Sequence, residues 1–280
     1  MFPNSDASPR VPSQAILTMD ANTFFSLIFG LLVGASLGLT GGGGSIFAVP
    51  LLIYGLAVPV GTAMGLSLAT VGVTAGFGAA SRWLHGEVEW KAGLLFALGG
   101  MLTAPLGTSL SRMIPPAALL SAFALLMIFV GWRMWRGRGE DSAKPSRCVT
   151  QGAGRFGPEC YLRLGSGGAA AGLLSGLFGV GGGFIIVPVL LFVTGMSIHR
   201  AVATSLLVIF LISISGVVAH VLHGQLFPMP LSLVFIGGGF AGMLLGSGLR
   251  SKLSGKSLQK IFALGMWLTA AWMLMKNISL

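Results

Sequence analysis

The sequence predicts an all-α, polytopic integral membrane protein made of two homologous repeats, with about eight to ten membrane segments. Two observations carry this prediction. Hydrophobic residues make up 54% of the 280-residue chain and charged residues only 9%. A soluble globule of this length needs more polar surface than that composition supplies. The second observation is a glycine-rich stretch near residue 41 that recurs in the second half of the chain.

The internal repeat emerges when the chain is shifted by 138 residues. GLTGGGGSIFAVPLL (38–52) then aligns with GLFGVGGGFIIVPVL (176–190), and the match continues to His85-Gly86 on His223-Gly224. An alignment of this extent indicates two copies of one membrane unit. The chain therefore divides into a polar N-terminal tail (1–20), a first membrane repeat (21–135), a basic linker (136–163) and a second membrane repeat (164–277).

Each repeat contains five apolar pieces, which in the first repeat span roughly 21–39, 46–60, 62–84, 91–112 and 116–135. Four of them are long enough to cross a membrane or nearly so. The piece from Ile46 to Val60 is shorter: at 1.5 Å per residue it reaches roughly 22 Å, whereas the hydrocarbon core is roughly 30 Å thick. We therefore expect short broken or re-entrant helices beside both glycine runs.

The net charge of +10 is better explained by cytoplasmic loops than by nucleic-acid binding, because Lys and Arg concentrate in the cytoplasmic loops of membrane proteins. With a cytoplasmic linker and inverted repeats, all Lys and Arg residues except Arg10, Arg112 and Lys276 lie inside. Parallel repeats would move Arg200 and the basic cluster at 250–260 outside. The charges thus favour inverted repeats, with both termini outside.

The glycine runs interrupt stretches that would otherwise continue as helix. Broken backbone at membrane depth is tolerated only where protein buries it or where it lines a watery cavity. The helix that restarts after each run offers free N–H groups and a positive dipole end, which bare glycine leaves accessible to a small anion. The candidate substrate-binding residues here are Gly41, Gly42, Gly43, Gly44 and Ser45, and Gly179, Gly181, Gly182 and Gly183. That the glycines serve only close helix packing stays open as an alternative.

Further candidates flank the runs. Pro50 and Pro188 occupy matching positions and are predicted to kink the short helices. The hydroxyls of Ser67, Thr204 and Ser205 are candidate donors to an anion's oxygens, with back-bonding to helix carbonyls as the alternative.

The histidines His85 and His223 precede glycines in matching loops, where helix C-capping and proton coupling are both consistent with the pattern. Cys148 and Cys160 are too few for a metal site. Neither a nucleotide-binding nor a catalytic motif is recognised. We therefore expect no cofactor, no metal and no enzymatic activity.

The residues GVGGGFIIVPVL (179–190), AVATSL (201–206) and His223-Gly224 resemble the signature of the TauE/SafE family of sulfite and organosulfonate exporters. The resemblance extends from about Phe24 to Met275 and is looser in the first repeat, which reads GGGGS. It implies an anion permease of the bacterial inner membrane, with about eight membrane segments and with sulfite, sulfoacetate or related sulfonates as substrates.

The sequence therefore predicts a multi-pass secondary transporter that exports a small sulfur-containing oxyanion by alternating access around the paired glycine breaks. An anion or small-solute channel with the same breaks as its filter is the alternative. The expected partners are the anionic substrate and the lipid bilayer, without nucleic acid, and homo-oligomerisation is left open.

Overall fold

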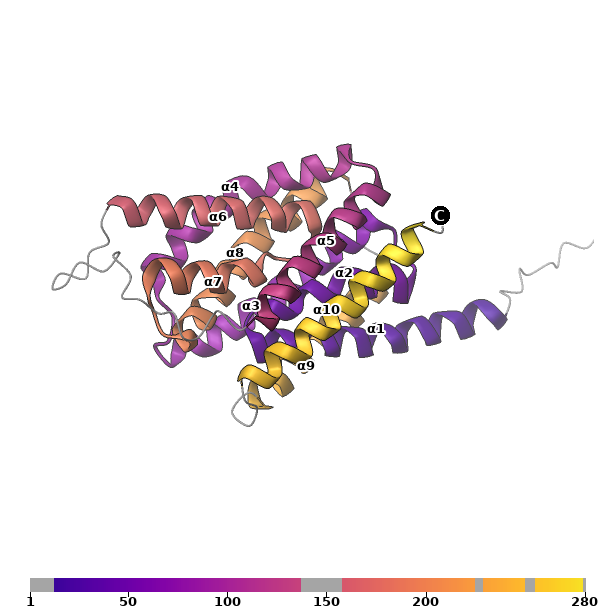
Figure 1. The fold of residues 1–280 in the computed structure, drawn as a ribbon. Coiled ribbons are helices and arrows are strands. Elements are labelled where there is room, and N and C mark those ends of the chain that lie inside the picture. Colours follow the sequence, from indigo (N-terminus) through magenta and orange to yellow (C-terminus); the bar gives the residue numbers. More distant parts are fainter. Residues whose placement is uncertain (1–12, 137–157, 225–228, 250–254, 279–280) are drawn as a thin grey trace, which may run out of the picture.

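A computed structural model describes residues 13–136, 158–224, 229–249 and 255–278, and these residues form helices and short connections (Figure 1). In this part of the chain there is no strand. The helices are α1 (Ser13–Thr40), α2 (Ala48–Pro50), α3 (Val60–Leu84), α4 (Trp90–Met113), α5 (Pro116–Trp135), α6 (Pro158–Phe178), α7 (Gly183–Thr194), α8 (Ile198–Leu222), α9 (Met229–Leu249) and α10 (Gly255–Ile278), with a 3₁₀ segment η1 (Gly43–Phe47) and a π-helical segment η2 (Leu51–Gly55) on either side of α2.

The helices begin and end close to the expected pieces, with two differences. The first helix begins at Ser13, inside the stretch expected to be a tail, and α6 begins at Pro158, inside the expected linker. Proline favours the first helical turn because its missing N–H is not needed there. The remainder of the expected tail and most of the linker lie outside the described residues.

Six of the described helices are long and apolar enough to cross a membrane: α1, α3, α4, α5, α8 and α9. Two shorter apolar helical stretches, Gly43–Gly55 and Gly183–Thr194, lie beside the glycine runs. Adding α6 and α10 gives eight segments, and counting the two short stretches as well gives ten, which is the range that the sequence predicted. Many large apolar side chains, such as Leu102, Leu162 and Leu222, are exposed on the outside of the bundle, as a lipid environment requires.

Close backbone contacts join α1 to α9. A β-carbon added at Gly34 would overlap the carbonyl oxygen of Gly239, and one at Gly38 would lie 2.7 Å from the carbonyl oxygen of Met243. Partner numbers rise together along the two helices, so α1 and α9 run parallel. Small residues permit such close approach between membrane helices.

The helices α4 and α6 are joined in the same way and lie side by side in Figure 1. A β-carbon at Gly168 would overlap the carbonyl oxygen of Phe96, and one at Gly172 would overlap that of Gly100. The residue numbers of the contacting pairs increase along both helices, so α4 and α6 also run parallel. Each long helix that ends at a glycine run is therefore packed, in parallel, on a helix of the other half of the chain.

Two further pairs join the halves, and both are antiparallel. A β-carbon at Gly72 in α3 would lie 2.8 Å from Cβ of Ser213 in α8, and one at Gly76 would lie 2.6 Å from the ring of Phe210. Between α5 and α10, the indole N–H of Trp267 donates to the carbonyl of Ile128 (3.2 Å), whereas Lys260 lies over the ring of Trp135.

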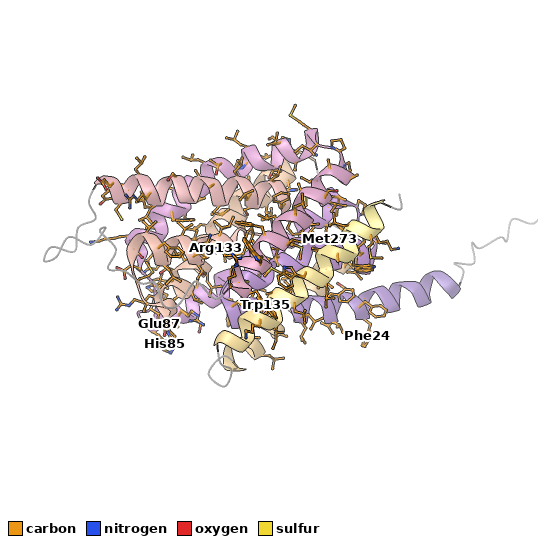
Figure 2. All side chains as sticks on the ribbon, viewed as in Figure 1. Phe24, His85, Glu87, Arg133, Trp135 and Met273 are labelled. Carbon is orange, nitrogen blue, oxygen red and sulfur yellow. The ribbon has the colours of Figure 1, made fainter. Side chains whose placement is uncertain are left out.

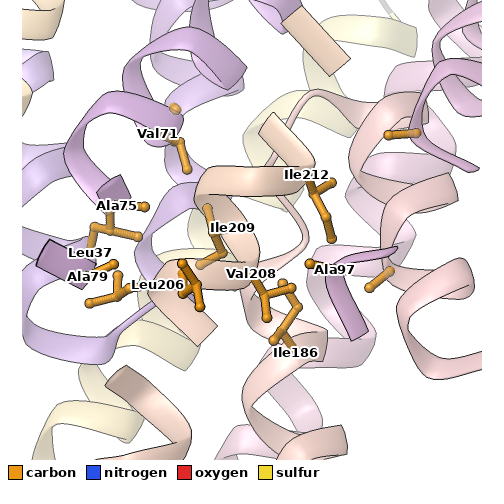
Figure 3. Close-up of a cluster of buried hydrophobic side chains, with 14 of the residues drawn as sticks. Leu37, Val71, Ala75, Ala79, Ala97, Ile186, Leu206, Val208, Ile209 and Ile212 are labelled. Carbon is orange, nitrogen blue, oxygen red and sulfur yellow. The ribbon is translucent and has the colours of Figure 1, made fainter. Parts of the chain in front are cut away.

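The apolar core lies between the halves. Figure 3 shows Leu37, Val71 and Ala75 from the first half close to Leu206 and Ile209 of α8. All are essentially inaccessible to solvent. The core therefore surrounds the segments that carry both glycine runs.

Candidate functional site

The two glycine breaks touch each other. A β-carbon built on Gly183 would lie 2.6 Å from Cα of Gly42, and one on Gly42 would lie 2.9 Å from Cα of Gly183. Both glycines are buried. The two backbones are thus in direct contact, and in this conformation no ion fits between them. Packing, the alternative reading of the glycine runs, therefore describes part of what these residues do.

In the first break the chain turns at Gly41 (φ 73°) and Gly42 (φ 151°), and then continues through η1, α2 and η2. The N–H of Gly44 donates to the hydroxyl of Thr40 (3.1 Å). The hydroxyl of Ser45 donates to the carbonyl of Gly42 (2.8 Å). Ser45, a predicted substrate ligand, is therefore used locally to fix the turn.

In the second break the chain turns at Gly179, Gly181 and Gly182, whose φ angles lie between 68° and 72°. The regular helix α7 follows, with Gly182 as its left-handed N-cap residue. The N–H groups of Ile185 and Ile186 both donate to the carbonyl of Gly182, at 3.0 and 3.2 Å. The second break therefore begins an ordered helix of twelve residues, while the first begins an irregular one.

Pro50 ends α2 and is followed at once by the π-helical segment, whereas Pro188 lies inside α7. Proline removes one backbone donor from a helix, and π-helical geometry occurs mostly as single turns within α-helices. The two prolines thus occupy matching sequence positions but different local geometries.

Ser205 bridges the two halves. Its hydroxyl donates to the carbonyl of Gly41 (2.7 Å) and also lies 2.8 Å from the carbonyl of Val202. The aligned Ser67 is also fully buried, yet its hydroxyl makes no hydrogen bond with any described residue. Ser67 lies one turn after Met64, whose Cα would be 2.5 Å from a β-carbon on Gly179. Both predicted serines therefore lie close to the breaks, but only one has a partner.

Two more hydroxyls near the second break also lack a partner among the described residues, although the repeat pattern of the sequence does not select them. Ser175 and Ser213 are buried and make no hydrogen bond within the described residues. A β-carbon on Gly182 would lie 3.5 Å from Cβ of Ser175, and one on Gly181 would lie 3.6 Å from Oγ of Ser213. A buried hydroxyl without a partner costs about 1–3 kcal/mol, so three of them beside one break call for a functional explanation.

Thr204 lies elsewhere. Its hydroxyl accepts a hydrogen bond from the N–H of Glu89 (3.0 Å), just before α4 begins. Its methyl group would contact a β-carbon on Gly93 at 3.0 Å. The structure thus places Thr204 at the contact between α8 and the start of α4 instead of beside the two glycine breaks.

The histidines end their helices. The N–H of His85 bonds to the carbonyl of Arg82 (3.2 Å), and that of His223 to the carbonyl of Ala219 (3.1 Å). Each is followed by a left-handed glycine, Gly86 (φ 69°) or Gly224 (φ 75°). This is the geometry of a helix C-cap. Figure 2 shows His85 beside Glu87 at one end of the bundle.

Groups of three or more side chains able to hold a metal ion are not found in the described segments. Cys160 is buried, and Cys148 lies outside the described residues. Two glycine breaks meet inside a bundle of membrane-length helices. These features define the class: this is a multi-pass, all-helical membrane protein in which helices are interrupted within the core.

The comparison with known proteins agrees with that class. The profile of the family described as "Sulfite exporter TauE/SafE" matches residues 26–273, so the chain belongs to the TauE/SafE family of membrane transporters. No solved structure matches the chain.

Several similar proteins carry transporter names. One is a probable membrane transporter protein of Xylella fastidiosa, 37% identical over 239 residues that cover 84% of this chain and 88% of the relative. Another is the probable membrane transporter protein YunE of Bacillus subtilis, 27% identical over 268 residues that cover 90% of this chain and 97% of the relative. The family is one of transporters, and the chain is not an enzyme.

Proposed function

We propose that this transporter exports a small sulfur-containing oxyanion, such as sulfite, sulfoacetate or a related sulfonate, by alternating access around the paired glycine breaks. The observation that carries the proposal is the contact of Gly42 with Gly183 in the core, near three buried hydroxyls that have no hydrogen-bond partner among the described residues. Hydroxyls bind an anion while remaining neutral, so they permit release as well as binding. The family description names sulfite, which supports the proposed substrate class.

The alternating mechanism requires that the two halves be inverted repeats of each other. Three contact patterns support this arrangement. The aligned helices α3 and α8 run antiparallel, and so do α5 and α10. The contact of Gly34 with Gly239 has its counterpart in the contact of Gly172 with Gly100, at aligned positions. A two-fold axis that lies in the plane of the membrane and relates the two halves produces this combination of parallel and antiparallel pairs.

Inverted repeats place the linker on one side of the bacterial inner membrane and both termini on the other, with the linker in the cytoplasm according to the distribution of Lys and Arg. A negative interior then favours anion export by about 2.3 kcal/mol per charge for each 100 mV. Export of an anion therefore requires no coupled cation.

In this mechanism, the contact between Gly42 and Gly183 is the closed state of the site. Rocking of one half against the other would separate the two backbones and let an anion reach the start of α7 and the hydroxyls of Ser175 and Ser213. Of the two aligned serines, Ser205 already bonds to Gly41. The hydroxyl of Ser67 is therefore the better candidate to bind the anion.

The test is flux through the purified protein in vesicles loaded with sulfite, sulfoacetate, taurine or sulfate. The variants Ser67→Ala and Ser213→Ala remove hydroxyls that stabilise nothing in the fold, so they separate transport from folding. Each is expected to lower transport efficiency by about tenfold or more, because a hydrogen bond to a charged group contributes about 1.5–3 kcal/mol.

The matched control is Ser247→Ala, whose exposed hydroxyl bonds back to Leu244 (2.9 Å) and which should transport like the wild type. Wild-type flux in both site variants would contradict the proposed site. Flux that does not speed up with substrate on the opposite side would favour a channel over a carrier.

A further inference from the structure

A cavity of about 270 Å³ opens at the end of the bundle where α5 begins. It lies between the first turn of α3, the last turn of α4, the start of α5 and the last turn of α8. Apolar side chains, including Val60, Met64 and Leu119, form most of its wall. Its volume lies just below the range of about 300–1,000 Å³ that is typical of pockets for drug-sized ligands, so it suits a smaller molecule.

The polar part of the wall carries positive charge. Arg112, Ser111 and His220 line the cavity. One guanidinium N–H of Arg112 donates to the carbonyl of His223 (3.0 Å), which holds the side chain in place. None of the described carboxylates forms an ion pair with Arg112. Arg112 is exposed to solvent at the mouth of the cavity, and an apolar wall beside a cation focuses the field of its charge on the space next to it.

The opposite end of the bundle differs in this respect. There Arg82, which aligns with His220, forms an ion pair with Glu87 (3.3 Å), and Arg200 forms one with Glu89 (3.6 Å). Each of these arginines has a carboxylate that offsets its charge. Arg112 differs from both, because none of the described carboxylates offsets its charge.

The cavity also leads toward the interior. Its wall includes Met64, and the backbone of Met64 packs on Gly179, at the second glycine break. One turn farther along α3 lies the unpartnered hydroxyl of Ser67. Met64 thus separates the cavity from the region that contains the proposed transport site.

We propose that this cavity is an anion-binding vestibule that takes small organic anions, with Arg112 holding the anionic group and Val60, Met64 and Leu119 covering an apolar carbon body. This inference rests on the proposed function for its role, since the vestibule would be the outer station of the same pathway. Its binding chemistry can nevertheless be tested without transport.

The experiment measures thiol labelling in purified protein from which Cys148 and Cys160 have been removed by substitution with alanine. Ser111→Cys places a thiol in the cavity, and Ser81→Cys places one at the other end of α3, beside the paired Arg82. Each is labelled at low ionic strength with 2-sulfonatoethyl methanethiosulfonate, an anion, and with the 2-trimethylammonioethyl reagent, a cation. The ratio of the two rates reports the local potential.

We expect the anion-to-cation rate ratio at Ser111→Cys to exceed that at Ser81→Cys, and to fall about fivefold to tenfold when Arg112→Gln is added, as unit charges about 6 Å apart in bulk water predict for two reagents of opposite charge. Arg112→Lys should retain most of the ratio. Ethanesulfonate should slow labelling of Ser111→Cys more than sulfate at equal concentration, because sulfate has no carbon body.

An unchanged ratio in Arg112→Gln, with the protein still monodisperse, would overturn the vestibule whatever the transport assays give. Equal protection by sulfate and ethanesulfonate would overturn its preference for organic anions. If the wild-type protein showed no sulfonate flux in vesicles but its labelling remained charge-selective, only the proposed function would be refuted.

Discussion

The two glycine breaks have nearly the same sequence but different backbones. The first turns at Gly41 and Gly42, whereas the second turns at Gly179, Gly181 and Gly182. Gly42, with φ 151°, aligns with Val180, which has no positive φ. Gly43 has no positive φ, yet its aligned partner Gly181 does. A repeated motif therefore does not imply a repeated conformation.

The hydrogen bonds of the aligned serines differ in the same way. Ser205 bonds to Gly41 across the two halves, whereas the hydroxyl of Ser67 has no hydrogen-bond partner in the described part of the chain. One serine therefore stabilises the contact between the halves, and the other is available for a ligand. Substitutions at aligned positions test whether this division of roles holds.

The largest effect is expected for Gly42→Val, which copies the second break into the first. The backbone of Gly42 is one that residues with a side chain rarely adopt, and the new β-carbon would lie 2.9 Å from Cα of Gly183. We expect a loss of about 3 kcal/mol or more of stability, from backbone strain and overpacking together. The measurement is the thermal midpoint of the detergent-solubilised protein. A midpoint equal to the wild type's would mean that the breaks are interchangeable.

The next largest effect is the difference in stability between Gly181→Ala and Gly43→Ala. Alanine at Gly181 would adopt φ 72° with its β-carbon 2.9 Å from Val71, whereas alanine at Gly43 would meet its nearest neighbour, the hydroxyl of Thr40, at 3.5 Å. The expected cost is about 1–3 kcal/mol for Gly181→Ala and close to zero for Gly43→Ala. Equal shifts of the thermal midpoint in the two variants would contradict the difference between the backbones.

A smaller effect distinguishes the serines. Ser205→Ala leaves the carbonyl of Gly41 without that donor and should cost about 1–3 kcal/mol, because a buried acceptor loses its partner. Ser67→Ala removes an unpaired hydroxyl and should leave stability unchanged or slightly raised, while transport falls. If Ser67→Ala destabilised the protein as much as Ser205→Ala, the hydroxyl of Ser67 would have a structural role. The proposed difference between the two serines would then be wrong.

The smallest effect is expected at the end of the bundle where Arg82 and Arg200 form ion pairs. Glu89→Gln removes the ion pair with Arg200, in which both side chains are partly exposed. Exposed pairs contribute typically less than about 1 kcal/mol, so we expect a midpoint close to that of the wild type. A loss comparable to that of Ser205→Ala would show that this end stabilises the contact between the halves.

The sequence predicted the features that depend on local patterns. Contiguous glycines in an apolar stretch predicted the two helix breaks, and the interval of 138 residues predicted that they are related. The shortness of the pieces after each run is confirmed by α7 and by the segments from Gly43 to Gly55. Glycine after His85 and His223 is consistent with the C-caps that the structure contains.

Other features could not be predicted in this way. The spacing of four residues from Gly30 to Gly38 is typical of close helix packing, but it does not indicate that α9 is the helix that lies opposite. Ser175 and Ser213 have no aligned serine, so the repeat gave no reason to select them. Thr204 was selected for its type and neighbours, but its direction depends on where α4 begins.

By itself the sequence determined that this chain is a membrane protein, that its helices break at two similar glycine runs, and which family it belongs to. Composition, hydrophobic length and contiguous glycines act locally, so they can be read without knowing what lies nearby. Only the tertiary structure decided that Gly42 meets Gly183, that Ser205 is bonded while Ser67 is not, and that Arg112 faces a cavity without a carboxylate partner. These features depend on which side chains of the other half lie opposite each position.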